Sequence, residues 1–284
     1  MPKPAILLAF TAILIWSNLA LISAQLTHVP PSLSVGIALC VSGIAGLVKL
    51  RAWLVPLKTF LVGLGGIFGY HYLVFTAFQH APVIEASLMN YLWPLLIVVL
   101  SPLFLRGYQL RWNHLMGALT GMAGASLIVT GGKFSLDLQY LQGYLFAASA
   151  ALIWASYSLL TKRLPPFSTA AVGGFCFFSG MISLLLFIPQ PGSINAIHAL
   201  TRLDWLFLIL LGLGPMGLAF FAWDAALKRG DPRIIGSLSY LTPLFSTSLL
   251  VFVGGKQITL VSVLAMLLIV SGAVIGSLEM FRQK

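Results

Sequence analysis

The sequence predicts an all-α integral membrane protein with ten transmembrane helices, arranged as two inverted repeats of five helices. Hydrophobic residues make up 59% of the chain and charged residues 8%, whereas a soluble domain contains about 25% charged residues. So few charges cannot cover a water-facing surface, and the mean hydropathy of +1.00 is in agreement. The number of long apolar runs and an internal repeat then define the arrangement.

Ten apolar runs approach the length of about 20 residues that a helix needs to cross a bilayer. The breaks between them carry proline, glycine or charge, as in Arg106-Gly107 and Gly254-Gly255-Lys256. None of the links is long enough to form a soluble domain. The predicted spans are residues 5–24, 32–49, 58–78, 83–104, 113–131, 141–160, 170–188, 204–226, 234–253 and 258–279.

The charges predict the orientation of these spans. The net charge is +10, which in a soluble chain would point to nucleic acid. Here all Lys and Arg residues except Lys133, Arg202 and Lys256 fall on one side, together with both termini. Because basic residues concentrate in cytoplasmic loops, we expect both termini in the cytoplasm and no nucleic-acid partner.

An internal repeat supports the inverted arrangement. Tyr91-Leu-Trp-Pro-Leu95 matches Tyr240-Leu-Thr-Pro-Leu244, and Ile15-Trp16 matches Ile153-Trp154. Five spans are an odd number, so the second copy must cross the membrane in the opposite sense. We expect residues 1–133 to form the first repeat and 134–284 the second, within one membrane domain. Inverted repeats recur in secondary transporters, which bind substrate near the midplane between the halves.

The matched prolines have a direct consequence for the backbone. Pro94 has no N–H, so the Asn90 carbonyl loses its helical partner, and Pro243 does the same to the Ser239 carbonyl. These kinks are either ordinary distortions that a membrane helix tolerates or hinges at which the helices bend.

Several polar and aromatic side chains are expected at mid-depth. They include His71 and Tyr91, with Trp16, Trp93 and Trp154. Polar groups in hydrocarbon are costly and usually face a protein interior or a wet cavity. Two acidic residues leave alternatives open. Glu85 either caps the N-terminal end of its helix, where negative charge is favourable, or attracts a substrate ammonium. Asp224 either pairs with Lys228 or carries protons.

At Glu85-Ala-Ser-Leu-Met-Asn-Tyr-Leu-Trp-Pro94 and Ala-Leu-Ile-Trp154-Ala-Ser, the chain resembles the drug/metabolite transporter superfamily. More closely, it is similar to the EamA-type aromatic amino acid exporters of the YddG group. The resemblance implies export of aromatic and other neutral amino acids from the cytoplasm, by alternating access, across the bacterial inner membrane. It also implies a central cavity lined by Tyr70, His71, Tyr91, Trp93 and Trp154, with Trp16 and Tyr240 as further candidates. In that cavity, Asn90 and the carbonyls of the kinked backbone would hold the substrate ammonium. Thr242 stands where the first repeat has Trp93, so we expect an asymmetric cavity.

The sequence also leaves one alternative function open. The alternative is an exporter of another small metabolite or a drug on the same fold, and a cationic cargo would require an acidic group in the cavity. An enzyme is not expected, because the spans contain neither HExxH nor GxSxG. Cys40 and Cys176 are isolated in apolar spans, so we expect no metal and no other cofactor.

Overall fold

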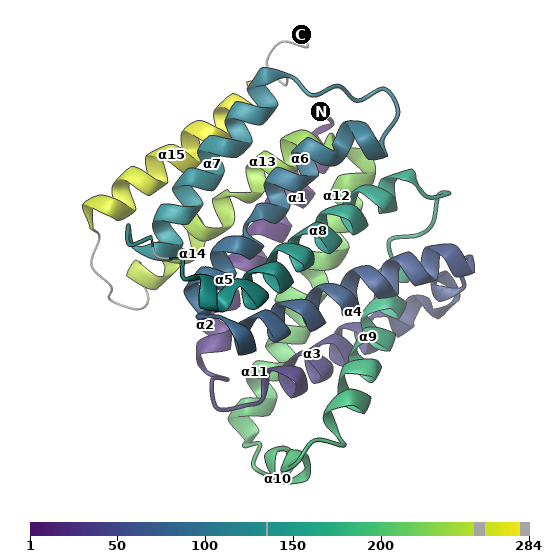
Figure 1. Ribbon diagram of the computed structural model, residues 1–284. Helices are drawn as coiled ribbons and strands as arrows, with labels where there is room; N and C mark the ends of the chain where they lie inside the picture. The colour runs from purple at the N-terminus through teal and green to yellow at the C-terminus, as the bar shows by residue number, and fades with distance from the viewer. Residues whose placement is uncertain (135, 253–258, 279–284) are drawn as a thin grey trace.

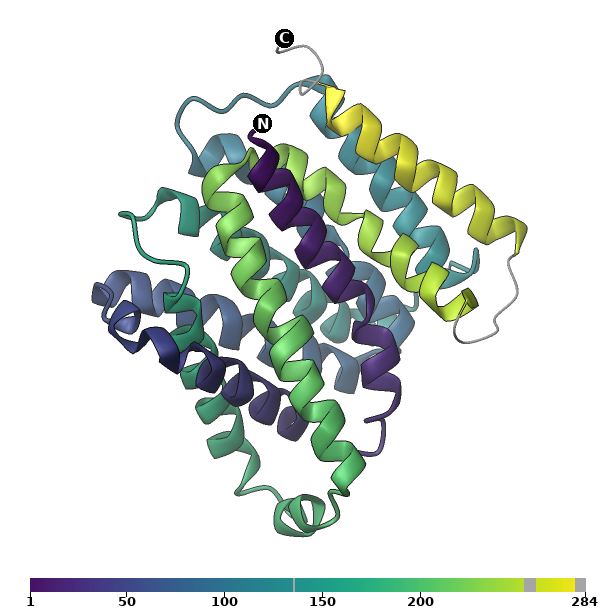
Figure 2. The same cartoon turned by 180° about the vertical axis from the view of Figure 1, so that it is seen from behind.

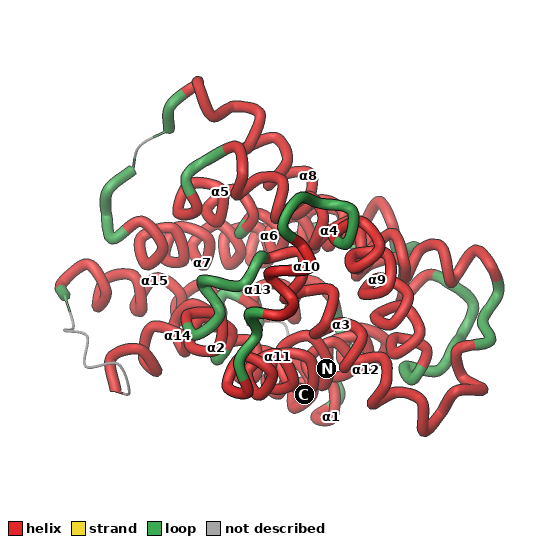
Figure 3. Tube along the Cα trace, turned by 90° about the horizontal axis from the view of Figure 1, so that it is seen from below, coloured by secondary structure: helices red, strands yellow, loops and turns green. Residues whose placement is uncertain are grey.

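The computed structural model describes residues 1–134, 136–252 and 259–278. Every regular element in these ranges is a helix, and none is a strand (Figure 3). The prediction of an all-α fold is therefore confirmed for the described part of the chain. The predicted break at Gly254-Gly255-Lys256 and the basic residues Arg282 and Lys284 lie outside the described residues.

The first half of the chain is a series of helices in which proline often occupies the first turn. Proline suits that position because its missing N–H has no helical partner there. The elements are α1 (Lys3–Ser17), α2 (Leu19–Ala24), α3 (Pro31–Gly46), η1 (Leu47–Trp53), α4 (Leu57–His80), α5 (Val83–Asn90), α6 (Leu92–Phe104) and α7 (Trp112–Thr130).

The second half continues in the same way after the short turn η2 (Leu138–Tyr140). One of its elements, η3, is a π-helical turn that interrupts a long helix. The elements are α8 (Leu141–Arg163), α9 (Ala171–Phe187), α10 (Ser193–His198), α11 (Arg202–Leu213), η3 (Gly214–Leu218), α12 (Ala219–Arg229), α13 (Pro232–Ser239), α14 (Leu241–Phe252) and α15 (Leu260–Gly276).

Six helical runs among the described residues are long and apolar enough to cross a membrane. Two shorter apolar helices, α9 and α15, have 17 residues each. The predicted count of ten spans therefore stays a prediction. The six runs are Lys3–Ala24, Pro31–Trp53, Leu57–His80, Val83–Phe104, Leu138–Arg163 and Arg202–Arg229.

Two helices are interrupted at equivalent positions of the predicted repeats. The break between α5 and α6 falls at Tyr91, and the break between α13 and α14 falls at Tyr240. Each lies three residues before a proline, Pro94 or Pro243. The expected disturbance of the backbone is thus present in both halves.

The two halves pack against each other along their lengths. Helix α4 lies along α8, α3 along α9, and α7 along α15. The last pair forms one edge of the bundle (Figures 1 and 2). Its close approach requires glycine, because a Cβ atom on Gly117 would lie 2.4 Å from the backbone nitrogen of Gly276. The beginning of α1 and the end of α15 lie at the same end of the bundle, and α10 lies at the opposite end.

Candidate functional site

A cavity of about 500 Å³ lies between the two halves of the chain. Its walls come from α1 to α6 on one side and from α8, α11, η3, α12 and α14 on the other. Seven of the eight predicted site residues line it: Trp16, Tyr70, His71, Asn90, Tyr91, Trp93 and Trp154. Residues far apart in the sequence therefore meet around one space.

Aromatic rings form one wall of this cavity, and Trp16 lies among them. Its ring centroid is 6.2 Å from that of Trp93, 6.1 Å from that of Trp154 and 6.2 Å from that of Phe220. Trp223 lies behind this wall, 5.2 Å from Trp16 and fully buried. The Trp16 indole donates a hydrogen bond of 3.0 Å to the carbonyl of Pro215 in the π turn. The rings are thus held by one another and by the backbone of η3.

His71 has a defined tautomer when its ring is neutral. Its Nδ1 atom lies 2.7 Å from the Ile67 carbonyl oxygen, which only accepts, so Nδ1 carries the proton. Nε2 is then the acceptor of the ring. On the facing helix, Asn90 donates from Nδ2 to the Tyr70 hydroxyl over 3.1 Å. The cavity therefore offers hydrogen-bonding groups beside its aromatic wall.

No Asp, Glu, Lys or Arg residue lines the cavity in the part of the chain that the structure describes. Its polar groups are hydroxyls, indoles, one imidazole and one amide. Transfer of a ligand with a net charge from water into this cavity is unfavourable, because no opposite charge in the wall would compensate for its lost hydration. A ligand without net charge suits this environment.

Tyr240 does not line the cavity, although it occupies the position equivalent to Tyr91. It is fully buried, and its hydroxyl lies at the break between α5 and α6. There it accepts from the Leu95 N–H over 3.1 Å and donates to the Tyr91 carbonyl over 3.4 Å. Its ring fits because Gly121 has no side chain, and a Cβ atom there would lie 2.6 Å from it. Packing against α7 thus directs Tyr240 away from the cavity.

The two acidic candidates also lie away from the cavity. Glu85 is in the first turn of α5 and accepts a hydrogen bond from the Tyr144 hydroxyl. Asp224 is 2% exposed and lies 2.7 Å from the Lys228 ammonium. Thr169 donates to the same carboxylate oxygen over 2.6 Å. The expected pairing of Asp224 with Lys228 is confirmed.

Sequence reasoning missed several residues of the cavity wall, among them Pro215, Met216 and Phe220. They lie in and just after η3. The sequence feature that could have indicated them is Gly214-Pro215 inside a long apolar run, because proline within a helix disturbs the backbone. Thr242 also lines the cavity, in agreement with the asymmetry expected from its alignment with Trp93.

A polar contact group, which we call the Arg233 group, joins the two halves near the start of α1. Arg233 pairs with Asp231 at 2.6 Å, donates to the Gln109 carbonyl, and lies 5.2 Å from the Tyr108 ring centroid. Partial burial and the Asp231 carboxylate raise the pKa of the Tyr108 phenol, against the opposing effect of Arg233. The group ties the link between α6 and α7 to the start of α13.

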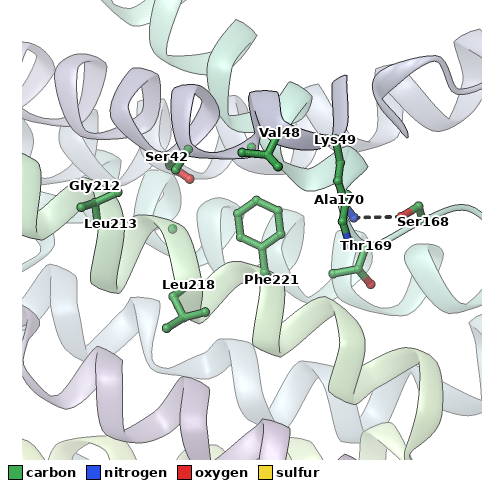
Figure 4. A pocket seen from close by; sticks show the side chains of 13 residues that line it. Ser42, Val48, Lys49, Ser168, Thr169, Ala170, Gly212, Leu213, Leu218 and Phe221 are labelled. Atoms are coloured by element: carbon green, nitrogen blue, oxygen red, sulfur yellow. Dashed lines mark hydrogen bonds between the residues drawn. The ribbon is translucent and has the colours of Figure 1, made fainter. Parts of the chain in front are cut away.

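A second cleft of about 530 Å³ lies between α3, the segment before α9, and η3 with α12 (Figure 4). Phe221 lies in its middle, and Lys49 lies beside Thr169 and Ala170 at one end. None of the predicted site residues lines this cleft.

Comparison with known proteins gives consistent matches. The EamA-like transporter family matches residues 3–130 and again 141–278. The aromatic amino acid exporter YddG of Ancylobacter novellus is 40% identical over 96% of this chain and 97% of that protein. The exporter of the same name from Salmonella typhimurium is 27% identical over 58% of this chain and 57% of its own length. A crystal structure of a protein 38% identical to this chain aligns with a TM-score of 0.91 over 100% of this chain and 99% of that one. With nearly all of its length matched in two successive copies, this chain belongs to the EamA-like transporter family.

Proposed function

We propose that this protein is a secondary transporter that exports aromatic and other neutral amino acids from the cytoplasm of a bacterium. The observation that carries the proposal is the cavity, which is walled by aromatic rings and lined by no charged side chain among the described residues. Its volume falls in the range of about 300–1,000 Å³ that is usual for small-molecule sites. The name of the Ancylobacter novellus relative, an aromatic amino acid exporter, points to the same cargo.

In this proposal the aromatic wall holds the side chain of the substrate. The ring centroids of Trp93 and Trp154 each lie about 6 Å from that of Trp16. At this distance aromatic rings attract each other, so the three indoles pack into one surface that can attract a further ring. A phenyl or indole ring fits such a wall, and an aliphatic side chain can cover it less completely. His71, Tyr70, Asn90 and Tyr91 complete the site, whereas Tyr240 supports it from outside.

The proposed topology has ten spans in two inverted repeats, residues 1–133 and 134–284, in the bacterial inner membrane. The two successive family matches support two repeats. The beginning of α1 and the end of α15 lie at the same end of the bundle, which supports an even number of membrane crossings. The bias of basic residues then assigns that end, with both termini, to the cytoplasm.

We propose further that the described conformation faces outward. Leu26, Thr27 and Val29, in the link between α2 and α3, line the cavity, and the proposed topology assigns this link to the outer side. Towards the cytoplasm lie the aromatic wall, Trp223 and then the Arg233 group. Opening to the cytoplasm therefore requires separation of the Arg233 group, with bending at Pro94 and Pro243.

The alternative cargo, a small metabolite or drug of another kind, is less well matched. A cationic drug requires an acidic group in the cavity, and neither Glu85 nor Asp224 lines it. A phosphorylated cargo requires Lys or Arg, which are likewise missing from the described lining. A catalytic role has no support from the family, whose described function is transport.

The test is transport by the purified protein in liposomes, followed with labelled phenylalanine, threonine and methionine. We expect saturable flux, fastest for phenylalanine. Trp93→Ala should reduce phenylalanine flux at least tenfold, whereas Trp112→Ala should not, because Trp112 is 76% exposed and outside the cavity. Absence of saturable flux for all three amino acids in the wild-type protein would refute the proposed function.

A further inference from the structure

The second cleft, between α3, the segment before α9, and η3 with α12, is separate from the central cavity. The run from α11 to α12 forms a wall between the two spaces, because Phe220 lines the central cavity and its neighbour Phe221 lines the cleft. The cleft is open at its side, since Leu213 and Leu218 in its lining are 46% and 57% exposed. Exposed leucines on a run apolar enough to cross a membrane face acyl chains. A lipid can therefore enter the cleft without passing through the central cavity.

The two ends of the cleft differ in chemistry (Figure 4). Lys49 lies at one end beside Thr169 and Ser168, and Gly212 and Leu213 lie at the other. In the part of the chain that the structure describes, Lys49 is the one charged side chain of the lining, and neither Asp nor Glu lines the cleft. A cationic end with an apolar remainder suits an amphiphile that carries a negative head group.

The Lys49 ammonium is available to such a head group. Its side chain is exposed and forms no hydrogen bond or ion pair with any residue that the structure describes. The Asp224 carboxylate behind this end of the cleft does not compensate it, because that group is buried and paired with Lys228. Ser168 is exposed, and its Oγ accepts from the Ala170 N–H over 3.2 Å, which leaves its own proton to donate. A phosphate can thus meet one cation and one hydroxyl donor here.

The link between α3 and α4, which carries Lys49, also has the composition of a membrane surface segment. Trp53 holds the link against α9, and its ring fits there because a Cβ atom on Gly174 would lie 3.0 Å from the indole Cγ. With Trp53 turned inward, Val48 and Leu54 are left 91% and 87% exposed. Basic and apolar side chains exposed together on one segment favour contact with the surface of an anionic leaflet. The link therefore adds a second observation that favours a lipid.

The length of the cleft matches one leaflet of a bilayer. Along the wall its lining runs from Gly212 to Phe221, nine residues apart, or about 13 Å at a rise of 1.5 Å per residue. Half of a hydrocarbon core of about 30 Å is about 15 Å. In the proposed topology the Lys49 end lies on the cytoplasmic side. An acyl chain that follows the cleft from that end therefore reaches about the middle of the bilayer.

We propose that the second cleft binds one anionic phospholipid of the cytoplasmic leaflet. The lipid phosphate lies between the Lys49 ammonium and the Ser168 hydroxyl, and one acyl chain lies along the cleft over Phe221. A zwitterionic lipid gains less at this site, because it carries its own cation beside the phosphate. The inference goes beyond the proposed function and does not depend on the cargo. Only the assignment to the cytoplasmic leaflet rests on the proposed topology.

The experiment is native mass spectrometry of the full-length protein, delipidated in detergent and titrated with dioleoylphosphatidylglycerol. Dioleoylphosphatidylcholine is the zwitterionic comparison, and glycerol 3-phosphate tests whether a head group alone binds. Lys49→Gln removes the cation, and Lys58→Gln is its matched control, because Lys58 is exposed just after the same link and lies outside the cleft. Ala45→Phe fills the cleft from α3. Its control is Ile44→Phe, because Ile44 is 55% exposed on the same helix and does not line the cleft.

We expect the wild-type protein to bind one phosphatidylglycerol about fivefold more tightly than phosphatidylcholine, and to bind no glycerol 3-phosphate at the same concentrations. Lys49→Gln should weaken phosphatidylglycerol binding about fivefold, the usual effect of one basic residue at an anionic membrane surface. Ala45→Phe should weaken it at least as much, and both control variants should bind like wild type.

Equal affinity of the wild-type protein for the two lipids overturns the proposal, as does unchanged binding in Lys49→Gln or Ala45→Phe. Equal weakening by Lys49→Gln and Lys58→Gln also overturns it, because binding then follows the general charge of the link and not the cleft. Binding of glycerol 3-phosphate that Lys49→Gln abolishes would assign the site to a free phosphate ester instead. Since each readout measures bound lipid and not transport, a failure here leaves the proposed function intact, and absent amino acid flux leaves this inference intact.

Discussion

Replacing Asp224 by Asn should lower the free energy of unfolding by about 3–5 kcal/mol, the usual cost of removing one partner of a buried ion pair. The Lys228 side chain is 20% exposed, and its ammonium lies 2.7 Å from the Asp224 carboxylate. In the variant, the contacts left to this cation are all uncharged: an amide oxygen in place of the carboxylate, the Phe167 carbonyl at 3.1 Å and the face of the Phe167 ring at 3.4 Å. None of them carries a full negative charge, so the ammonium stays largely uncompensated.

The double variant Asp224→Asn/Lys228→Met should recover most of this loss, because it removes the uncompensated cation and keeps the aliphatic stem. Thermal unfolding in detergent, followed by tryptophan fluorescence, measures both effects. On the scaling known for domains of 150–250 residues, the single variant should lose at least roughly 6 °C.

The same double variant tests the alternative role of Asp224 in proton transfer. If the pair is structural, phenylalanine transport in liposomes should respond to an imposed pH gradient as it does in the wild type. The reasoning fails if Asp224→Asn is as stable as wild type, or if the double variant is no more stable than the single one. A folded double variant that loses its response to the gradient would assign the carboxylate to coupling instead.

Three further predictions concern the cavity and its supports. Tyr240→Phe should cost about 1–3 kcal/mol, because it leaves the Leu95 N–H without its partner. Tyr72→Phe, at a tyrosine 53% exposed, is the control, and equal unfolding temperatures would contradict the role of the hydroxyl. His71→Phe should reduce phenylalanine flux at least tenfold while preserving the fold, by removing the Nε2 acceptor; unchanged flux would remove His71 from the site. Lysine and glutamate should compete with labelled phenylalanine at least about a hundredfold less well than methionine does, because the cavity wall offers no opposite charge, and comparable competition would disprove that account.

The broken helices illustrate how far local sequence determines this structure. Pro94 and Pro243 each remove one backbone donor, and the helices are interrupted close by at Tyr91 and Tyr240. That outcome depends on the chain within one helical turn, so it could be predicted directly. The sequence could not show that Pro215 and Met216 of the π turn, and Phe220 just after it, reach the cavity. A proline predicts a distortion but not the direction in which it turns its neighbours.

Glu85 and Asp224 show the same limit for charged residues. Both occur within apolar spans, and the sequence left a substrate or coupling role open for each. Their side chains instead meet Tyr144 and Lys228. For Asp224 the partner is four residues away and was predictable, whereas for Glu85 it comes from the other half of the chain.

By itself, the sequence determined that this chain is all-helical and apolar enough for a membrane, that it repeats itself, and that aromatic and polar side chains recur within its apolar runs. These properties depend on composition and on periodicity along one chain. Only the tertiary structure decided which of two equivalent tyrosines, Tyr91 or Tyr240, reaches the cavity. The physical reason is packing: Gly121 on α7 leaves room for the Tyr240 ring, so the rotation of each helix follows from the volume of neighbours that lie far away in the sequence.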